Sequence, residues 1–405
     1  MTSTYDVPPP LLPGYPGPAI ERLGESSFYV VRSWDLIAEA ASRAADFSSN
    51  LTATMVIDEG GAISEFPVAE LGSPLHALAT ADGEVHRVHR TLVLPSLTPR
   101  TLRSWAPFVT LTLRRLWTER YDNGIDWVRD VAERLPAAVV AELIGVRQEH
   151  SDELLDWAFA STAILDGVVA QAELDAAVAS VGRFMAFLDD ELRRARNAPP
   201  TTVIGDLARL VNDGALDHDV AIQVLLQLIV AGIESTVGHL GSLAWRLGQY
   251  PEHIAGMRAD PATRDAFIEE VLRLDAPFIG HYRHVLRDTE LGGTSLPADS
   301  HLFLLWGSAN RDENYFADPD QFIPARDDGT HLTFGRGIHF CVGAALARLE
   351  SRAALDLLLD QGPGLHIDAA AGSWQPSMLV RRLRSLRITV ERSARNTPPR
   401  AHDVT

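Results

Sequence analysis

The segment from Asp217 to Pro251, "DHDVAIQVLLQLIVAGIESTVGHLGSLAWRLGQYP", constrains the fold more than any other part of the chain. At helical spacing it is apolar on most of its faces, which is typical of a helix that is buried on all sides. A helix of this length can be buried only if other helices surround it. The sequence therefore predicts a large, mostly helical core.

The remaining pattern adds a minor β part to this core. Apolar residues recur at helical spacing from Thr98 to about Gly280 and again from Cys341 to Gln361. Short runs such as "FYVV" (Phe28–Val31) and "SLRITVE" (Ser385–Glu391) alternate with turn residues and predict strands. Residues 57–80 have no clear period and predict a long loop. The expected fold class is mainly α with a minor β part.

No linker or internal repeat divides the chain. We expect a proline-rich N-terminal arm over residues 1–20, one domain over residues 21–392, and a disordered tail over residues 393–405.

Composition excludes several classes of function. A net charge of −18 argues against nucleic-acid binding, which needs a basic surface. None of the basic residues is lysine, so P-loop NTPases and enzymes with a lysine Schiff base are excluded. The single cysteine excludes internal disulfides and cysteine-rich zinc sites. We find no signal peptide and no apolar run that approaches the ~20 residues needed to span a membrane. We therefore expect a cytoplasmic protein without a membrane span.

That single cysteine, Cys341, lies in the stretch "FGRGIHFCVG". Glycines on either side let a loop approach a flat ligand without Cβ clashes. The segment that follows is a strong helix former, so the sulfur is expected near a helix N-terminus, where a negative charge is favoured. A thiolate in such a place suits haem ligation. The alternative is a buried free cysteine in a turn.

The pattern Phe-Gly-x-Gly-x-His-x-Cys-x-Gly resembles the haem-binding loop of the cytochrome P450 family. It is filled by Phe334, Gly335, Gly337, His339, Cys341 and Gly343. The resemblance implies the cytochrome P450 fold, a triangular helix-rich prism enclosing haem b (iron protoporphyrin IX). It also implies that Cys341 is the axial iron ligand and that Phe334, Gly335, His339 and Gly343 contact the haem.

A second resemblance concerns an acid–arginine pair. Glu270 and Arg273 stand three residues apart, so they share a helix face and can form an ion pair. They match the family's Glu-x-x-Arg, and Arg326 fits the later arginine that completes this trio. The resemblance implies a structural role beneath the haem. An ordinary surface ion pair is the alternative.

The stretch "AGIEST" (Ala231–Thr236) resembles the family's site of oxygen activation. By position, Glu234 is the acid and Ser235 the alcohol that deliver protons, and Ala231 contacts the haem. Serine departs from the usual threonine. Thr236 follows directly and is expected to face differently, because successive helical residues are about 100° apart.

The haem propionates need cationic or hydrogen-bonding partners. His86 and Arg90 stand four apart on one helix face and resemble the family's His-x-x-x-Arg. Arg283 matches a family arginine with the same role, and His339 is the fourth expected contact.

The resemblance implies a haem-thiolate monooxygenase that inserts one oxygen atom from O2 into a C–H bond, by hydroxylation or dealkylation. Electrons are expected from a ferredoxin and its NAD(P)H-dependent reductase. Arg87, Arg90, Arg336 and Arg348 are candidates for a basic docking patch. The alternatives are a P450-fold enzyme that uses peroxide or couples substrates oxidatively, and a haem protein that binds ligands without turnover.

The resemblance also implies a largely apolar substrate pocket, and hence a hydrophobic small molecule. Its expected walls are the 57–80 loop and the residues Gln227, Val230, Ala231, Phe278, Ile279, His281, Met378 and Leu379. Gln227 and His281 are the candidates for hydrogen bonds to a polar group on the substrate.

Overall fold

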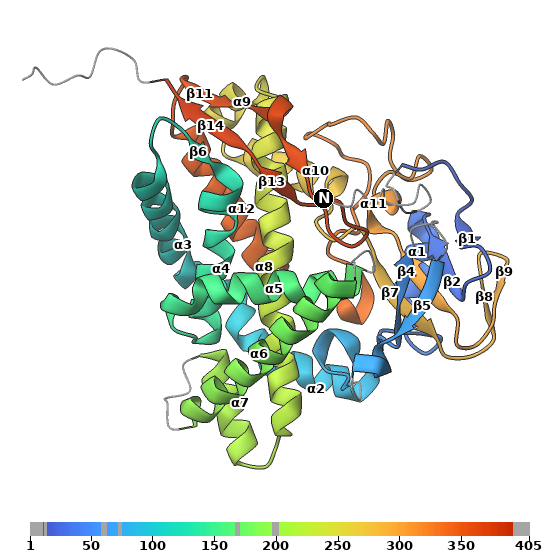
Figure 1. Cartoon of the computed structure of the whole chain (residues 1–405). Coiled ribbons are helices and arrows are strands. Elements are labelled where there is room, and N and C mark those ends of the chain that lie inside the picture. The colour runs from blue at the N-terminus through green and yellow to red at the C-terminus, as the bar shows by residue number, and fades with distance from the viewer. Residues whose placement is uncertain are drawn as a thin grey trace, which may run out of the picture.

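In the computed structural model, the long apolar segment forms the helix α8 (His218–Gln249), which runs through the middle of the molecule among other helices (Figure 1). The side chain of Asp217 caps its start by accepting hydrogen bonds from the backbone N–H groups of Asp219 and Val220. The prediction of a long buried core helix is confirmed. The structure describes residue 11 and residues 14–57, 63–71, 75–166, 171–196 and 202–391.

Among the described residues, α8 is also the one helix long and apolar enough to cross a membrane. Polar residues such as Gln227, Glu234 and His239 nevertheless interrupt α8, so its uninterrupted apolar runs remain short, as expected. Half of its most apolar window is buried inside the protein. Core helices of soluble proteins commonly pass the same test, so length and composition alone are weak evidence for a span.

Helices dominate the described chain, as the periodicity predicts. The other α-helices are α1 (Trp34–Ser42), α2 (Gly83–Val93), α3 (Pro99–Arg120), α4 (Arg134–Ile144), α5 (Ser151–Asp166), α6 (Gln171–Ala195), α7 (Val203–Asn212), α9 (His253–Ala259), α10 (Ala262–Leu274), α11 (Trp306–Ala309) and α12 (Ala344–Leu359). Short 3₁₀ helices include η2 (Val68–Leu71), η3 (Leu78–Thr80), η4 (Leu94–Leu97), η6 (Gln148–His150), η7 (Gly337–His339) and η8 (Ala369–Ala371), and η5 (Val128–Ala132) is a π turn.

Strands gather mainly on one side of the molecule, next to α1 (Figure 1). A five-stranded sheet has the order β1 (Ile20–Arg22), β2 (Phe28–Val31), β10 (His301–Leu304), β7 (His281–Val285) and β3 (Phe47–Ser48). Smaller sheets contain β4 (Ala53–Ile57), β5 (Ile63–Pro67), β6 (Ile125–Asp126), β8 (Thr289–Leu291), β9 (Thr294–Leu296), β11 (Leu365–Ile367), β12 (Ser373–Trp374), β13 (Leu383–Ser385) and β14 (Arg387–Val390). In the large sheet β10 is parallel to β2 and antiparallel to β7, with Leu304 opposite His281.

Two local predictions can be compared with these elements. The strands expected in "FYVV" and "SLRITVE" are confirmed as β2 and β14. The long loop expected over residues 57–80 is wrong in part, because β5 pairs with β4 and two 3₁₀ helices follow. The apolar partner strand β4 supplies the cross-strand contacts that the periodicity of residues 57–80 alone does not reveal. Most of the expected arm, and all of the tail over 393–405, lie outside the described residues.

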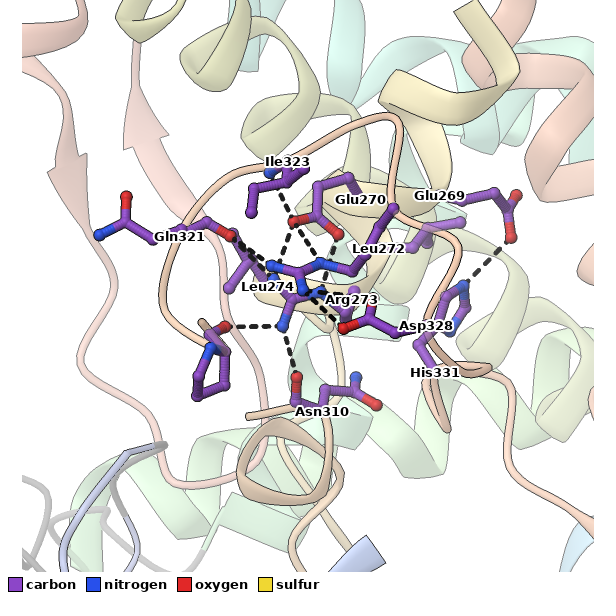
Figure 2. A network of polar contacts seen from close by, with 12 residues as sticks. Glu269, Glu270, Leu272, Arg273, Leu274, Asn310, Gln321, Ile323, Asp328 and His331 are labelled. Carbon is purple, nitrogen blue, oxygen red and sulfur yellow. Dashed lines mark hydrogen bonds and ion pairs between the residues drawn. The ribbon is translucent and has the colours of Figure 1, made fainter. Parts of the chain in front are cut away.

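A buried ion pair on α10 anchors the chain that leads toward Cys341. Two nitrogens of Arg273 lie 2.7 and 2.8 Å from the two carboxylate oxygens of Glu270, and both side chains are almost fully buried. Arg326 approaches the same carboxylate, with 3.3 Å between its Nε and Oε1 of Glu270. The structure thus brings together the three residues of the expected trio, of which Figure 2 labels Glu270 and Arg273.

The same guanidinium also binds the backbone. Arg273 donates to the carbonyl oxygens of Asn310 (2.6 Å), Pro319 (2.7 Å) and Gln321 (3.0 Å), and the backbone N–H of Ile323 donates to Glu270 (2.8 Å). These bonds join α10 to the segment 310–326, which has no regular secondary structure of its own (Figure 2). The pair therefore satisfies buried backbone groups that would otherwise lack partners.

Arg273→Ala is expected to destabilise the protein by about 3–5 kcal/mol, because it leaves the buried Glu270 carboxylate and several carbonyl oxygens uncompensated. The measurement is the free energy of unfolding from urea denaturation. Arg352→Ala is the matched control: its ion pair with Asp265 is about half exposed and is expected to contribute less than ~1 kcal/mol. Equal losses in the two variants would contradict a special role for the buried pair.

Candidate active site

An internal cavity lies between α8 and the loop that carries Cys341, and most residues expected from the motifs meet there. Its walls come from α2, η3, α4, α8, β7, α11, the 333–343 loop and α12. The expected residues that line it are His86, Arg90, Gln227, Ala231, Ser235, Thr236, Phe278, His281, Arg283, Phe334, Gly335, His339, Cys341 and Gly343. Segments far apart in the sequence thus form one site.

The loop before Cys341 is closed by backbone contacts. The N–H of Cys341 donates to the carbonyl oxygen of Phe334 over 2.8 Å. Gly335 and Gly337 have φ values of +68° and +72°, in the region that L residues with side chains rarely adopt. At Gly337 a Cβ would also lie 2.8 Å from the carbonyl oxygen of Ala41 in α1. This glycine therefore permits both the turn and the close approach of α1.

The Cys341 sulfur is enclosed by the protein but faces the cavity. Cys341 lies three residues before the first residue of α12, and the backbone N–H groups of Gly343 and Ala344 donate to its sulfur. The residue counts as exposed because its open surface faces the cavity. Burial raises the pKa of the thiol, and the donated hydrogen bonds and the charge of Arg90 lower it. A cation bound at the sulfur would further favour the thiolate.

Two arginines in the cavity wall have no carboxylate partner among the described residues. Arg283 is 9% exposed and donates to the carbonyl oxygen of Tyr282 (2.7 Å), and burial lowers its pKa to about 10. Burial also lowers the pKa of Arg90. Buried cations are costly unless an anion compensates them. The cavity wall is therefore suited to bind a ligand with negative charges.

His86 and His339 lie beside these arginines. Their ring centroids are 4.2 Å apart, and Nε2 of His339 is 3.4 Å from a carboxylate oxygen of Asp82. Burial lowers the pKa of His86 to about 4, with the charge of His339 as the next largest cause. His86 is thus a neutral donor or acceptor at physiological pH.

This set of groups fits the expected haem. Haem is a flat apolar group with two carboxylates and an iron atom that accepts an axial thiolate. The cavity offers a thiol on one wall, two unpaired arginines and two histidines for the carboxylates, and apolar walls that include Leu78, Val140 and Leu346. The thiol suits the iron, the arginines and histidines suit the carboxylates, and the apolar walls suit the ring.

The expected acid and alcohol of α8 face different surroundings. Ser235 lines the cavity, and its hydroxyl donates to the carbonyl oxygen of Ala231 (2.6 Å). Thr236, which directly follows Ser235, also lines the cavity, and the expectation that the two side chains face differently stays a prediction. Glu234, which does not line the cavity, accepts a hydrogen bond from Thr162 of α5 (3.1 Å) and lies 3.3 Å from Nε of Arg382.

The Glu234 carboxylate is almost fully buried. Burial raises its pKa to about 7, while the charge of Arg382 and the hydrogen bond from Thr162 lower it. A carboxyl group with a pKa near neutrality can both hold and release a proton at physiological pH.

Gln227 lines the cavity but is already engaged with the 78–80 helix. Its side-chain oxygen accepts from the N–H of Ala79 (2.9 Å), and its side-chain nitrogen lies 3.3 Å from the hydroxyl of Thr80. It therefore fastens η3 to α8. Phe278 and His281 also line the cavity.

Four expected pocket residues, Val230, Ile279, Met378 and Leu379, do not line the cavity, although all four are described. Ile279, Met378 and Leu379 are buried in an apolar cluster with residues of β2, β4 and β10. The carboxylate of Asp166, at the end of α5, accepts from the backbone N–H groups of Met378 (2.7 Å) and Leu379 (2.9 Å). These contacts hold the turn against α5. A substrate-pocket role for these four residues stays a prediction.

The expected basic patch is largely compensated by carboxylates. Arg87 pairs with Glu84, and Arg348 forms a two-pronged ion pair with Glu269 at 2.6 and 2.7 Å. Arg90 lines the cavity. Arg336, like Arg90, has no carboxylate partner among the described residues, and its guanidinium lies over the ring of Trp34.

Two cavity residues carry polar groups that the motifs do not indicate. His239 lies one turn after Ser235 in α8, and neither of its ring nitrogens has a partner in the described chain. Glu350 of α12 is 1% exposed, and its Oε2 is likewise unpartnered. Burial lowers the pKa of His239 to about 4 and raises that of Glu350 to about 8. Polar residues at expected core positions are the one sequence signal that marks them.

Comparison with known proteins is consistent with this geometry. Residues 212–361 match the family model described as "Cytochrome P450". Cytochrome P450 144 of Mycobacterium tuberculosis is 44% identical over 92% of this chain and 86% of its own length. The 6-deoxyerythronolide B hydroxylase of Saccharopolyspora erythraea is 33% identical over 81% of this chain and 82% of its own length.

Solved structures give the same result for the fold. A mutant of P450 EryK in complex with erythromycin B superposes with a TM-score of 0.80 at 29% identity, over 94% of this chain and 95% of that one. P450BioI in complex with a ligated acyl carrier protein has a TM-score of 0.80 at 26% identity, over 90% and 92% of the two chains.

Glu350→Gln is expected to flatten the dependence of stability on pH. With its pKa near 8 in the folded protein, Glu350 keeps a proton that the unfolded chain releases above about pH 4.3, so its contribution to stability falls as pH rises from 5 to 8. Across this range, the free energy of unfolding of the variant should rise relative to that of the parent by up to about 1.4 kcal/mol per pH unit. Urea unfolding at a series of pH values measures this.

Glu119→Gln, at an exposed position on α3, is the control for this experiment and should leave the slope unchanged. A parent and a Glu350→Gln variant with equal slopes would show that this carboxyl group is not buried as a neutral acid.

Proposed function

Because this chain belongs to the cytochrome P450 family, whose members are haem-dependent monooxygenases, we propose that it inserts one oxygen atom from O2 into a C–H bond of a hydrophobic small molecule, by hydroxylation or dealkylation. The observation that carries the proposal is the position of Cys341. Its sulfur faces the cavity that Ser235 also lines, and it receives two backbone hydrogen bonds. When bound there, haem supplies the activation of oxygen.

The chain's own residues have distinct roles in this proposal. Cys341 would hold the iron, and its two N–H donors would moderate the charge on the sulfur. Arg90, Arg283, His86 and His339 would bind the carboxylates of the haem. Ala231, Phe334, Gly335 and Gly343 would contact the haem and exclude water.

Ser235 and Glu234 are proposed to deliver protons in sequence. The Ser235 hydroxyl is at the cavity wall, and the carbonyl of Ala231 orients it. Glu234 is one residue away on the side of α5, where a pKa of about 7 allows it to exchange protons. Thr236 offers a second hydroxyl at the wall. Transfer from Glu234 to Ser235 then passes through water or a change of the Glu234 rotamer.

The substrate is proposed to bind against Phe278, Leu78, Val140 and Leu228, which are apolar and line the cavity. We propose a ferredoxin with an NAD(P)H-dependent reductase as the electron supply and the cytoplasm as the location. Arg336, which has no carboxylate partner in the described chain, is the best available contact for an acidic ferredoxin.

Cys341→Ala is expected to abolish the red-shifted Soret band of the reduced, CO-bound protein, because the thiolate ligand is lost. Ile338→Ala is the matched control on the same loop, since Ile338 is 46% exposed and does not line the cavity. A red-shifted band that persists in Cys341→Ala would refute thiolate ligation by this residue. Absence of the band in the parent protein would refute the proposed function as a whole.

Ser235→Ala is expected to lower the product formed per NAD(P)H consumed by roughly tenfold or more, because a positioned proton donor is lost. Ser235→Thr keeps the hydroxyl and should retain coupling. Ser242→Ala is the control, because Ser242 is buried in the same helix and does not line the cavity. Coupling that is unchanged in Ser235→Ala, or equal turnover with peroxide alone, would favour a peroxide-dependent enzyme.

A further inference from the structure

A histidine in the cavity wall is held by a tryptophan. Nε1 of Trp306 donates to Nδ1 of His281 over 2.6 Å. Trp306 begins α11 shortly after β10 ends, and His281 begins β7, the antiparallel neighbour of β10. The register of the sheet, with Leu304 opposite His281, brings the two rings together. Both residues line the cavity.

This contact fixes the protonation state of the imidazole. An indole N–H can only donate, so Nδ1 of His281 must accept and carries no proton. The ring is therefore neutral, and its single proton resides on Nε2. Burial favours the same state, because it lowers the pKa of His281 to about 3. At physiological pH the imidazole is a hydrogen-bond donor with one defined direction.

The Nε2–H group has no acceptor in the described part of the chain. The protein encloses His281, and the surface that the residue keeps open lines the cavity. Arg283 follows two residues later in β7 and therefore projects from the same face of the strand. Arg283 and His339 are also the residues whose charges act on His281. The free donor thus lies among the groups assigned above to the haem carboxylates.

We propose that His281, positioned by Trp306, is a fixed neutral hydrogen-bond donor to a carboxylate of the haem, beside Arg283 and His339. This inference rests on the proposed function. It assigns to the cofactor a residue that the sequence places in the substrate pocket. Arg90 and Arg283 already match the two carboxylate charges. A neutral donor therefore adds a directed hydrogen bond without leaving an excess of buried positive charge.

The test uses the haem-loaded protein and two readouts that do not depend on turnover. One is the rate of haem transfer to excess apomyoglobin, and the other is the position of the propionate bending modes in the resonance Raman spectrum. His281→Phe keeps a ring and removes the donor. It should release haem roughly tenfold faster or more, as expected for a lost hydrogen bond to a charged group, and should shift one propionate mode.

Two further variants distinguish the loss of the hydrogen bond from a change in side-chain size. Trp306→Phe keeps an aromatic ring but frees the His281 tautomer, and should give a smaller effect in the same direction. His281→Gln returns an N–H donor and should restore part of the haem retention. Both variants keep the proposal testable if His281→Phe folds poorly. His284→Phe is the control, because His284 lies on the same strand, pairs with Asp299 and does not line the cavity.

Unchanged haem release and unchanged propionate modes in His281→Phe would overturn the proposal. Normal haem retention, combined with weaker binding of ketone or alcohol ligands than of hydrocarbons of the same shape, would also overturn it and would assign His281 to the substrate. A red-shifted CO band retained in every variant separates these outcomes from failure of the proposed function.

Discussion

The fork of hydrogen bonds around Arg273 is the interaction on which the rest of the site depends. One buried guanidinium binds a carboxylate and three backbone carbonyl oxygens, and thereby fixes a stretch of chain without regular secondary structure. That stretch leads directly into the loop of Cys341. The loop therefore follows directly on a segment that an ion pair has organised. Buried ion pairs are weak evidence for net stability, but they define one arrangement of the groups around them.

The cavity combines two electrostatic environments. Its wall carries Arg90, Arg283 and the neutral imidazole of His86, which suit carboxylates, and a sulfur that receives two backbone N–H groups. Much of the remaining wall is apolar. The apolar walls strengthen each electrostatic contact, because a low local dielectric reduces screening. Glu234 is kept outside this space by Thr162 and Arg382, so the site holds an ionisable acid near the cavity without exposing a charge to it.

Much of the fold and the cofactor site was predictable, because their signals are local. The helical period of α8, the i,i+3 spacing of Glu270 and Arg273, and the glycines near Cys341 each encode geometry within a few residues. The pocket walls were not predictable in the same way. Met378 and Leu379 turn inward to a different cluster because Asp166, far away in sequence, binds their backbone. The hydrogen bond between Gln227 and η3 likewise depends on how two distant segments pack together. The hydrogen bond between Trp306 and His281 depends on the register of the sheet.

The position of the one thiol has a practical consequence for labelling chemistry. Cys341 is the only cysteine of the chain, and it lines the cavity. A thiol reagent that modifies this protein therefore reacts at the place where the cofactor is proposed to bind. The number of reactive thiols per chain then reports the fraction of molecules that lack a bound ligand at the sulfur. A count of reactive thiols therefore measures how much of the protein carries the cofactor.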